Sequence, residues 1–296
     1  MCPQRPFSAT PHTSHRRPEP DAYPLPFGKL VDVGGYRVHL YCAGTGSPTV
    51  VIVGAPFSVD WALVQPEVAK ITQVCAYDQS GLGWSDDGPQ DSCSLRVGEV
   101  HAALKNARIK APYVLLGHSL GGLVARLYES QFPDEVAGLV LVDHARPLSI
   151  VVAPLAGNAN APASPASPMH VTALRGLDTD PNFSRLPARN RELHEWAKSR
   201  KHRFPQTNVQ QCFSELASTT KEHEHSLGDK PLVDVSTDED RDPDYVEFQT
   251  KLLSLSQNSK EIIAVGSSHY VIIDRPDAVI DATSQVVRSV RKRSKL

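Results

Sequence analysis

Residues 113–122 read Y-V-L-L-G-H-S-L-G-G, a short apolar run followed by a serine set between glycines. A continuous apolar run of this kind is typical of a strand buried on both faces of a sheet. The residues from Leu120 to about 131 predict a helix. The spacing G-x-S-x-G therefore places Ser119 in a tight turn from strand to helix. In such a turn neighbouring glycines relieve crowding and the hydroxyl is exposed at the edge of the sheet.

Similar apolar runs lie on both sides of this stretch and alternate with helix-like segments. This alternation implies right-handed βαβ units, and hence an α/β fold with a mostly parallel twisted sheet flanked by helices on both faces. A Gly-Gly pair near the beginning predicts a hairpin before the first of these units. The further apolar runs are at 49–54, 72–78, 138–143, 231–236 and 260–266, and the further helical segments are at about 61–70, 94–109, 244–256 and from Pro276 onward.

Two segments depart from the alternation. Residues 1–28 are rich in Pro, His, Ser and Arg and have few apolar residues to bury, so they predict a disordered arm. Residues 145–228 begin with an Ala- and Pro-rich stretch and predict an inserted cap or lid above the carboxyl ends of the strands. The expected core comprises residues 29–144 and 229–296.

The composition is that of an ordinary globular protein. The chain has 296 residues, with 31 basic and 33 acidic side chains and a formal net charge of −2. A balance of this kind gives no global field that would attract nucleic acid. No apolar run approaches the length of a membrane span, so we expect no membrane span and no nucleic-acid partner.

The cysteines are five in number and scattered, with no C-x-x-C pair. Their pattern predicts neither a disulfide framework nor a zinc site, and it fits a reducing compartment. We expect no metal and no cofactor. The cysteines are Cys2, Cys42, Cys75, Cys93 and Cys212.

A histidine directly after the last predicted strand is the candidate general base for Ser119. His269 lies in G-S-S-H-Y, far beyond the serine in the chain, and the order serine then histidine is the one that the elbow motif requires. His223 and His225, in K-E-H-E-H-S, are typical of a solvated face rather than of a metal site.

Three further motifs carry a resemblance to a known family. Residues 77–86, Y-D-Q-S-G-L-G-W-S-D, match the pattern D-x-x-G-x-G-x-S-D, and residues 266–276 contain G-x-x-H followed by D-x-P. Residues 54–56, G-A-P, are similar to an H-G-x-P turn, with Val53 in place of the histidine. Over residues 30–290 the chain resembles the α/β-hydrolase superfamily, in its serine-nucleophile, esterase- or lipase-like branch and its peroxisomal fungal-type members.

The resemblance also implies an oxyanion hole formed by the backbone N–H groups of Leu120 and Ala55. It leaves two aspartates open as the acid that orients the imidazole. Asp240 occupies the commoner place, after the seventh strand, but its loop lacks the usual glycine turn and is crowded with acids. Asp143 is a lone carboxylate at the end of G-L-V-L-V-D and resembles the acid position of the haloalkane-dehalogenase branch. The sequence favours Asp143 and keeps Asp240 as the alternative.

The expected function is hydrolysis of a carboxylic ester, lactone or thioester through an acyl-serine intermediate, with a small acyl compound as substrate. One alternative is acyl transfer or cyclisation in specialised metabolism, in which a hydroxyl replaces water. Another is a non-catalytic ligand-binding protein of the same fold. Epoxide hydrolases and dehalogenases of this fold need aspartate at the elbow, so Ser119 excludes that chemistry.

The sequence ends in Ser294-Lys295-Leu296 after a basic stretch. S-K-L at a C-terminus is read by an import receptor as a peroxisomal address. The expected location is therefore the peroxisome, with the import receptor as partner, and otherwise the cytoplasm.

Overall fold

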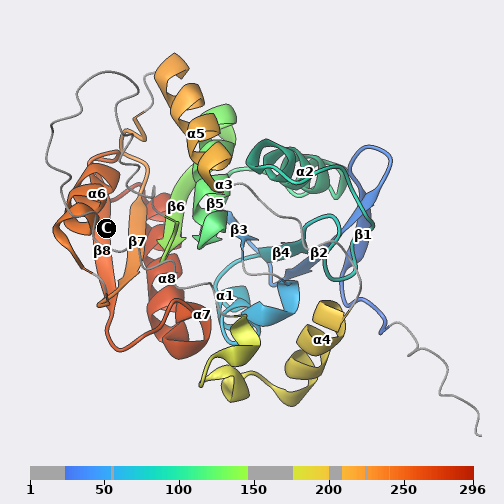
Figure 1. Ribbon diagram of the computed structural model, residues 1–296. Coiled ribbons are helices and arrows are strands. Elements are labelled where there is room, and N and C mark those ends of the chain that lie inside the picture. Colours follow the sequence, from blue (N-terminus) through green and yellow to red (C-terminus); the bar gives the residue numbers. More distant parts are fainter. Residues whose placement is uncertain (1–23, 55–56, 146–175, 200–208, 224–225, 240) are drawn as a thin grey trace, which may run out of the picture.

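The structure is a computed structural model that describes residues 24–54, 57–145, 176–199, 209–223, 226–239 and 241–296 (Figure 1). In these residues a sheet of eight strands has the order β1-β2-β4-β3-β5-β6-β7-β8. β2 runs antiparallel to both β1 and β4, and all other pairs are parallel. The strands are β1 (Lys29–Asp32), β2 (Arg37–Ala43), β3 (Thr49–Val53), β4 (Val74–Asp78), β5 (Tyr113–His118), β6 (Val136–Val142), β7 (Leu232–Thr237) and β8 (Ser259–Ala264).

Helices cover both faces of the sheet, as the alternation of elements predicted. Successive residues of β5 face opposite sides: Val114 belongs to one hydrophobic cluster and Leu115 to the other. This is why its sequence is apolar throughout rather than alternating. The first cluster is completed by α1 (Gln65–Ala69) and α8 (Pro276–Lys292), the second by α2 (Cys93–Asn106) and α3 (Leu120–Gln131). α6 (Pro243–Leu253) packs beside β8, and the short α7 (Val271–Asp274) packs beside α8 (Figure 1).

The chain between β6 and β7 contains the segment predicted as the cap, and its described helices lie in two places. α5 (Val209–His223) packs on α2 and α3, whereas α4 (Ala188–Ser199) packs on the 3₁₀ turn η1 (Ser58–Trp61), as Figure 1 shows. Two more 3₁₀ turns, η3 (Leu177–Thr179) and η4 (Phe183–Arg185), precede α4.

The end of the predicted N-terminal arm lies against the core. The ring of Phe27 packs edge-on to Trp84, with 4.9 Å between ring centroids, and Trp84 Nε1 donates a hydrogen bond of 2.7 Å to the carbonyl oxygen of Pro24. Residues 1–23 of the arm lie outside the described residues.

The prediction that the cysteines form no disulfides was wrong, because two disulfides join four of the five cysteines. One links Cys42 to Cys75 and the other links Cys93 to Cys212. The first pair stands directly opposite on the neighbouring strands β2 and β4. The second pair is separated by 119 residues in the chain. The spacing of the cysteines along the sequence does not show that the members of either pair are close in space. The prediction of a reducing compartment rested on the absence of disulfides, so it loses its basis.

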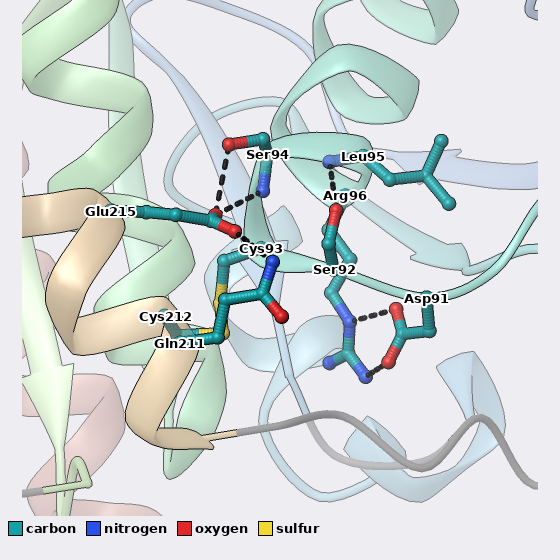
Figure 2. The surroundings of a disulfide bond; sticks show 9 residues. All are labelled: Asp91, Ser92, Cys93, Ser94, Leu95, Arg96, Gln211, Cys212 and Glu215. Atoms are coloured by element: carbon teal, nitrogen blue, oxygen red, sulfur yellow. Dashed lines mark hydrogen bonds and ion pairs between the residues drawn. A yellow bond between two sulfur atoms is a disulfide. The ribbon is translucent and has the colours of Figure 1, made fainter.

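The second disulfide fastens α5, which lies in the segment predicted as the cap, to α2 (Figure 2). Beside it, Glu215 of α5 accepts hydrogen bonds from the backbone N–H of Ser94, at 2.9 Å, and from its hydroxyl, at 2.8 Å. A carboxylate at the N-terminus of a helix is favourable because the first N–H groups have no intrahelical partner. A disulfide and two hydrogen bonds therefore attach α5 to the N-terminal end of α2.

None of the helices described here combines the length and hydropathy that crossing a bilayer requires.

Candidate active site

Ser119 lies in the turn between β5 and α3, with φ 55° and ψ −127°. This backbone conformation is rare for a residue with a side chain and is common at functional sites. The flanking glycines are needed because the chain is packed tightly there. A Cβ on Gly117 would lie 2.6 Å from the carbonyl oxygen of Gly121, and a Cβ on Gly121 would lie 2.1 Å from the carbonyl oxygen of Val53. The elbow geometry thus explains both glycines of the motif.

His269 follows β8 and reaches the serine with one ring nitrogen. Its Nε2 lies 3.0 Å from Ser119 Oγ, and its Nδ1 lies 2.6 Å from Asp143 Oδ2. An ionised carboxylate only accepts hydrogen bonds, so the proton of the neutral imidazole belongs on Nδ1. Nε2 is then free to accept the hydroxyl hydrogen of Ser119. The structure thus brings the predicted serine, histidine and aspartate together in one chain of hydrogen bonds.

Asp143 directly follows β6 and also has a positive φ, 36°. Its backbone N–H donates to the carbonyl oxygen of Val235, at 2.8 Å, which ties its loop to β7. The alternative acid, Asp240, lies outside the described residues. Asp238, in the same loop as Asp240, accepts a hydrogen bond of 2.8 Å from the N–H of Gly266. Of the acids that the structure describes, Asp143 is the one bonded to the imidazole of His269.

His118 is a further residue of the site that the sequence analysis did not single out. It is buried, its ring lies 4.9 Å from that of His269, and its Nε2 donates to the His269 carbonyl oxygen at 2.9 Å. Burial and the nearby imidazole of His269 lower the pKa of His118 to about 4. It therefore stays neutral at pH 7 and places no positive charge beside the imidazole of His269. Its position inside the elbow motif was the only signal in the sequence.

The structure places one of the two predicted oxyanion donors. Leu120 is the first residue of α3, so its N–H has no intrahelical acceptor and lies at the positive end of the helix dipole. Ala55 lies outside the described residues. Before it, Gly54 has φ 100°, and its carbonyl oxygen accepts a hydrogen bond of 2.8 Å from Trp61 Nε1.

In the part of the chain that the structure describes, no group of three or more His, Cys, Asp or Glu side chains is arranged to hold a metal ion.

Comparison with known proteins identifies the family. The model of the alpha/beta hydrolase family matches residues 34–282, which is most of the chain. The chain belongs to the alpha/beta hydrolase family.

The curated proteins that this chain is similar to are distant in sequence. The protein YqjL of Bacillus subtilis is 23% identical over 85% of this chain and 88% of its own length. The 2-hydroxymuconate semialdehyde hydrolase of a Pseudomonas species is 32% identical over 40% of this chain and 44% of its own. A Schizosaccharomyces pombe protein is 31% identical over 36% of this chain, and the match spans only 26% of that longer protein.

Solved structures agree on the fold. An epoxide hydrolase, CorEH, aligns with a TM-score of 0.58 at 19% identity, over 89% of this chain and 98% of that one. A meta-cleavage product hydrolase from Pseudomonas fluorescens, CumD, aligns with a TM-score of 0.62 at 15% identity, over 89% and 98%. At these identities the likeness establishes the alpha/beta hydrolase fold alone.

Proposed function

We propose that this hydrolase cleaves a carboxylic ester, lactone or thioester through an acyl-serine intermediate. The observation that carries the proposal is the continuous chain of hydrogen bonds from Ser119 Oγ through the His269 imidazole to the Asp143 carboxylate, at 3.0 and 2.6 Å. A serine, a base and an orienting acid in this order are the arrangement that activates a hydroxyl nucleophile.

The mechanism follows from the roles of the three side chains. Ser119 Oγ attacks the acyl carbon while His269 Nε2 takes its proton, and the collapse of the tetrahedral intermediate releases the alcohol or thiol, which receives that proton. Asp143 holds the imidazole in the Nδ1–H form and stabilises the imidazolium. Water then gives a proton to the same imidazole and attacks the acyl-serine. When the acyl–Oγ bond breaks, the acid is released and Ser119 Oγ receives that proton. The N–H of Leu120 would stabilise the oxyanion in both steps.

Labelling with a fluorophosphonate tests the nucleophile, and a panel of p-nitrophenyl esters, lactones and acyl-CoA thioesters of increasing length tests the substrate class. We expect covalent labelling at Ser119 and turnover of at least one class. Product analysis in the presence of an added alcohol distinguishes hydrolysis from acyl transfer. If the folded protein is neither labelled nor active on any of these compounds, the proposal fails in favour of a ligand-binding role.

The peroxisomal address remains a prediction from the sequence. In the structure Lys295 Nζ donates to Asp229 Oδ1 at 3.0 Å, and the N–H of Leu296 donates to Asn258 Oδ1 at 2.9 Å. An import receptor would therefore have to bind Lys295 and Leu296 although both are hydrogen-bonded to the rest of the protein. The two disulfides weigh against the address, because disulfides are typical of oxidising compartments.

Deleting residues 294–296 tests this address. In a eukaryotic host, a protein with a fluorescent domain fused to its N-terminus is expected to form peroxisomal puncta, and the deletion is expected to make it diffuse with unchanged activity in vitro. A full-length fusion that is diffuse, or that enters the secretory pathway, contradicts the address.

A further inference from the structure

The buried carboxylate of Asp274 accepts a hydrogen bond from the backbone of the loop that carries His269. The backbone N–H of Ser268, the residue before His269, donates to Asp274 Oδ2 at 2.7 Å. The Asp274 side chain is almost fully buried. Hydrogen bonds to a buried carboxylate are stronger than those between neutral groups. The position of Ser268, and with it the backbone of His269, is therefore fixed partly by this carboxylate.

The cap contacts the same loop on both of these residues. Ser268 Oγ donates to Asp180 Oδ2 at 2.7 Å. Asn182 Nδ2 donates to Asp274 Oδ1 at 2.8 Å, and Arg185 Nη1 donates to the Asp274 carbonyl oxygen at 2.6 Å. Three cap side chains thus meet the two residues that hold the loop of the catalytic base.

The cap segment has a second attachment to the core, which sets where these side chains lie. His194 Nδ1 lies 2.7 Å from Asp60 Oδ1, and both side chains are buried. Asn190 Nδ2 donates to the carbonyl oxygen of Val59 at 2.9 Å. These two contacts anchor α4 to η1. The 3₁₀ turns before α4 are therefore held against the His269 loop and do not move together with that loop.

We propose that Asp180 is a positioning residue for the catalytic base. It acts through the hydroxyl of Ser268, which also accepts a hydrogen bond of 3.1 Å from the N–H of Tyr270 and so bridges across His269. The cap therefore helps to hold the imidazole at 3.0 Å from Ser119 Oγ. This inference rests on the proposed acyl-serine chemistry, because only a reaction that uses His269 as base is sensitive to that distance.

The test is a double-mutant cycle of Asp180→Ala and Ser268→Ala in the full chain. Each single variant is expected to lower kcat and the rate of fluorophosphonate labelling by about tenfold to a hundredfold, with little change in KM, because a misplacement of about 1 Å can cost a hundredfold. Both lose the same hydrogen bond, so the double variant should lose less than the product of the two single losses. Asp180→Asn keeps an oxygen that can accept from Ser268 and should restore most of the rate.

Lys198→Met is the matched control. Lys198 pairs with Asp178 within the cap and has no contact with the His269 loop among its described partners. This variant should label at the wild-type rate. Melting temperatures measured for all variants separate loss of fold from loss of position, and Ser268→Ala tests the bond from the core side if Asp180→Ala does not fold.

Two results separate this inference from the proposed function. Labelling of wild-type protein with unchanged rates in folded Asp180→Ala or Ser268→Ala would overturn the positioning role alone. Absence of labelling in the wild-type protein would overturn the acyl-serine proposal itself, and with it the positioning role. Losses that multiply in the double variant would show that the two residues act independently and would also overturn the role of the shared bond.

Discussion

Ser119→Ala is expected to abolish turnover and fluorophosphonate labelling while leaving the protein folded. Removing the nucleophile of such a triad lowers kcat by about 10⁶-fold. The fold should survive because alanine also has a Cβ, so the backbone conformation of the elbow, φ 55°, is no more strained than with serine. Ser119 is only partly buried and its Oγ atom contacts His269 Nε2, so no core packing is lost.

The measurements are kcat on the best compound of the panel, the rate of labelling, and the melting temperature. An alanine variant that is labelled at the wild-type rate would contradict the assignment of Ser119. A variant with a much lower melting temperature would show that the hydroxyl also has a structural role.

Asp143→Asn is expected to lower kcat by up to about 10⁴-fold, which corresponds to an activation barrier raised by roughly 5.5 kcal/mol. An amide can donate to Nδ1 of His269 and so favours the tautomer with the proton on Nε2, which can no longer accept from Ser119. The carboxylate lies at the end of a strand and the amide has nearly the same size, so the fold should be retained. The measurement is kcat together with the melting temperature.

Asp240→Asn is the comparison for this prediction, because Asp240 occupies the alternative acid position. Its replacement is expected to cost little, since its loop contains several neighbouring acids. If the two results are exchanged, with Asp240→Asn severe and Asp143→Asn mild, Asp143 is not the orienting acid.

Local sequence patterns were enough to predict the sheet and the turn at Ser119. The run Y-V-L-L before Ser119 is apolar throughout because its residues face two hydrophobic clusters, and this reading of β5 was confirmed by the structure. The glycines around Ser119 report a close approach of backbone within a few residues, which is a local property that a sequence records directly.

Contacts between segments that are distant in the sequence could not be predicted from local sequence patterns. The pairing of Cys93 with Cys212 depends on how α5 packs on α2, and no residue pattern near either cysteine reports that packing. The bonds from Asp180 and Asn182 to the His269 loop depend on the path of the cap, which has no motif of its own. Between the two candidate acids, the sequence could compare loop composition but not the direction in which either carboxylate points.

The link between α2 and α5 changes what a cut in the backbone would do. Cys93 and Cys212 close a covalent ring that contains the elbow, the strand before Asp143 and most of the cap. A protease that cleaves one peptide bond anywhere between these cysteines leaves two fragments that stay joined. Such a nicked molecule would migrate as a single intact species until a reductant is added, and two bands would appear only then. A cut between Cys93 and Cys212 is therefore visible only on a reducing gel.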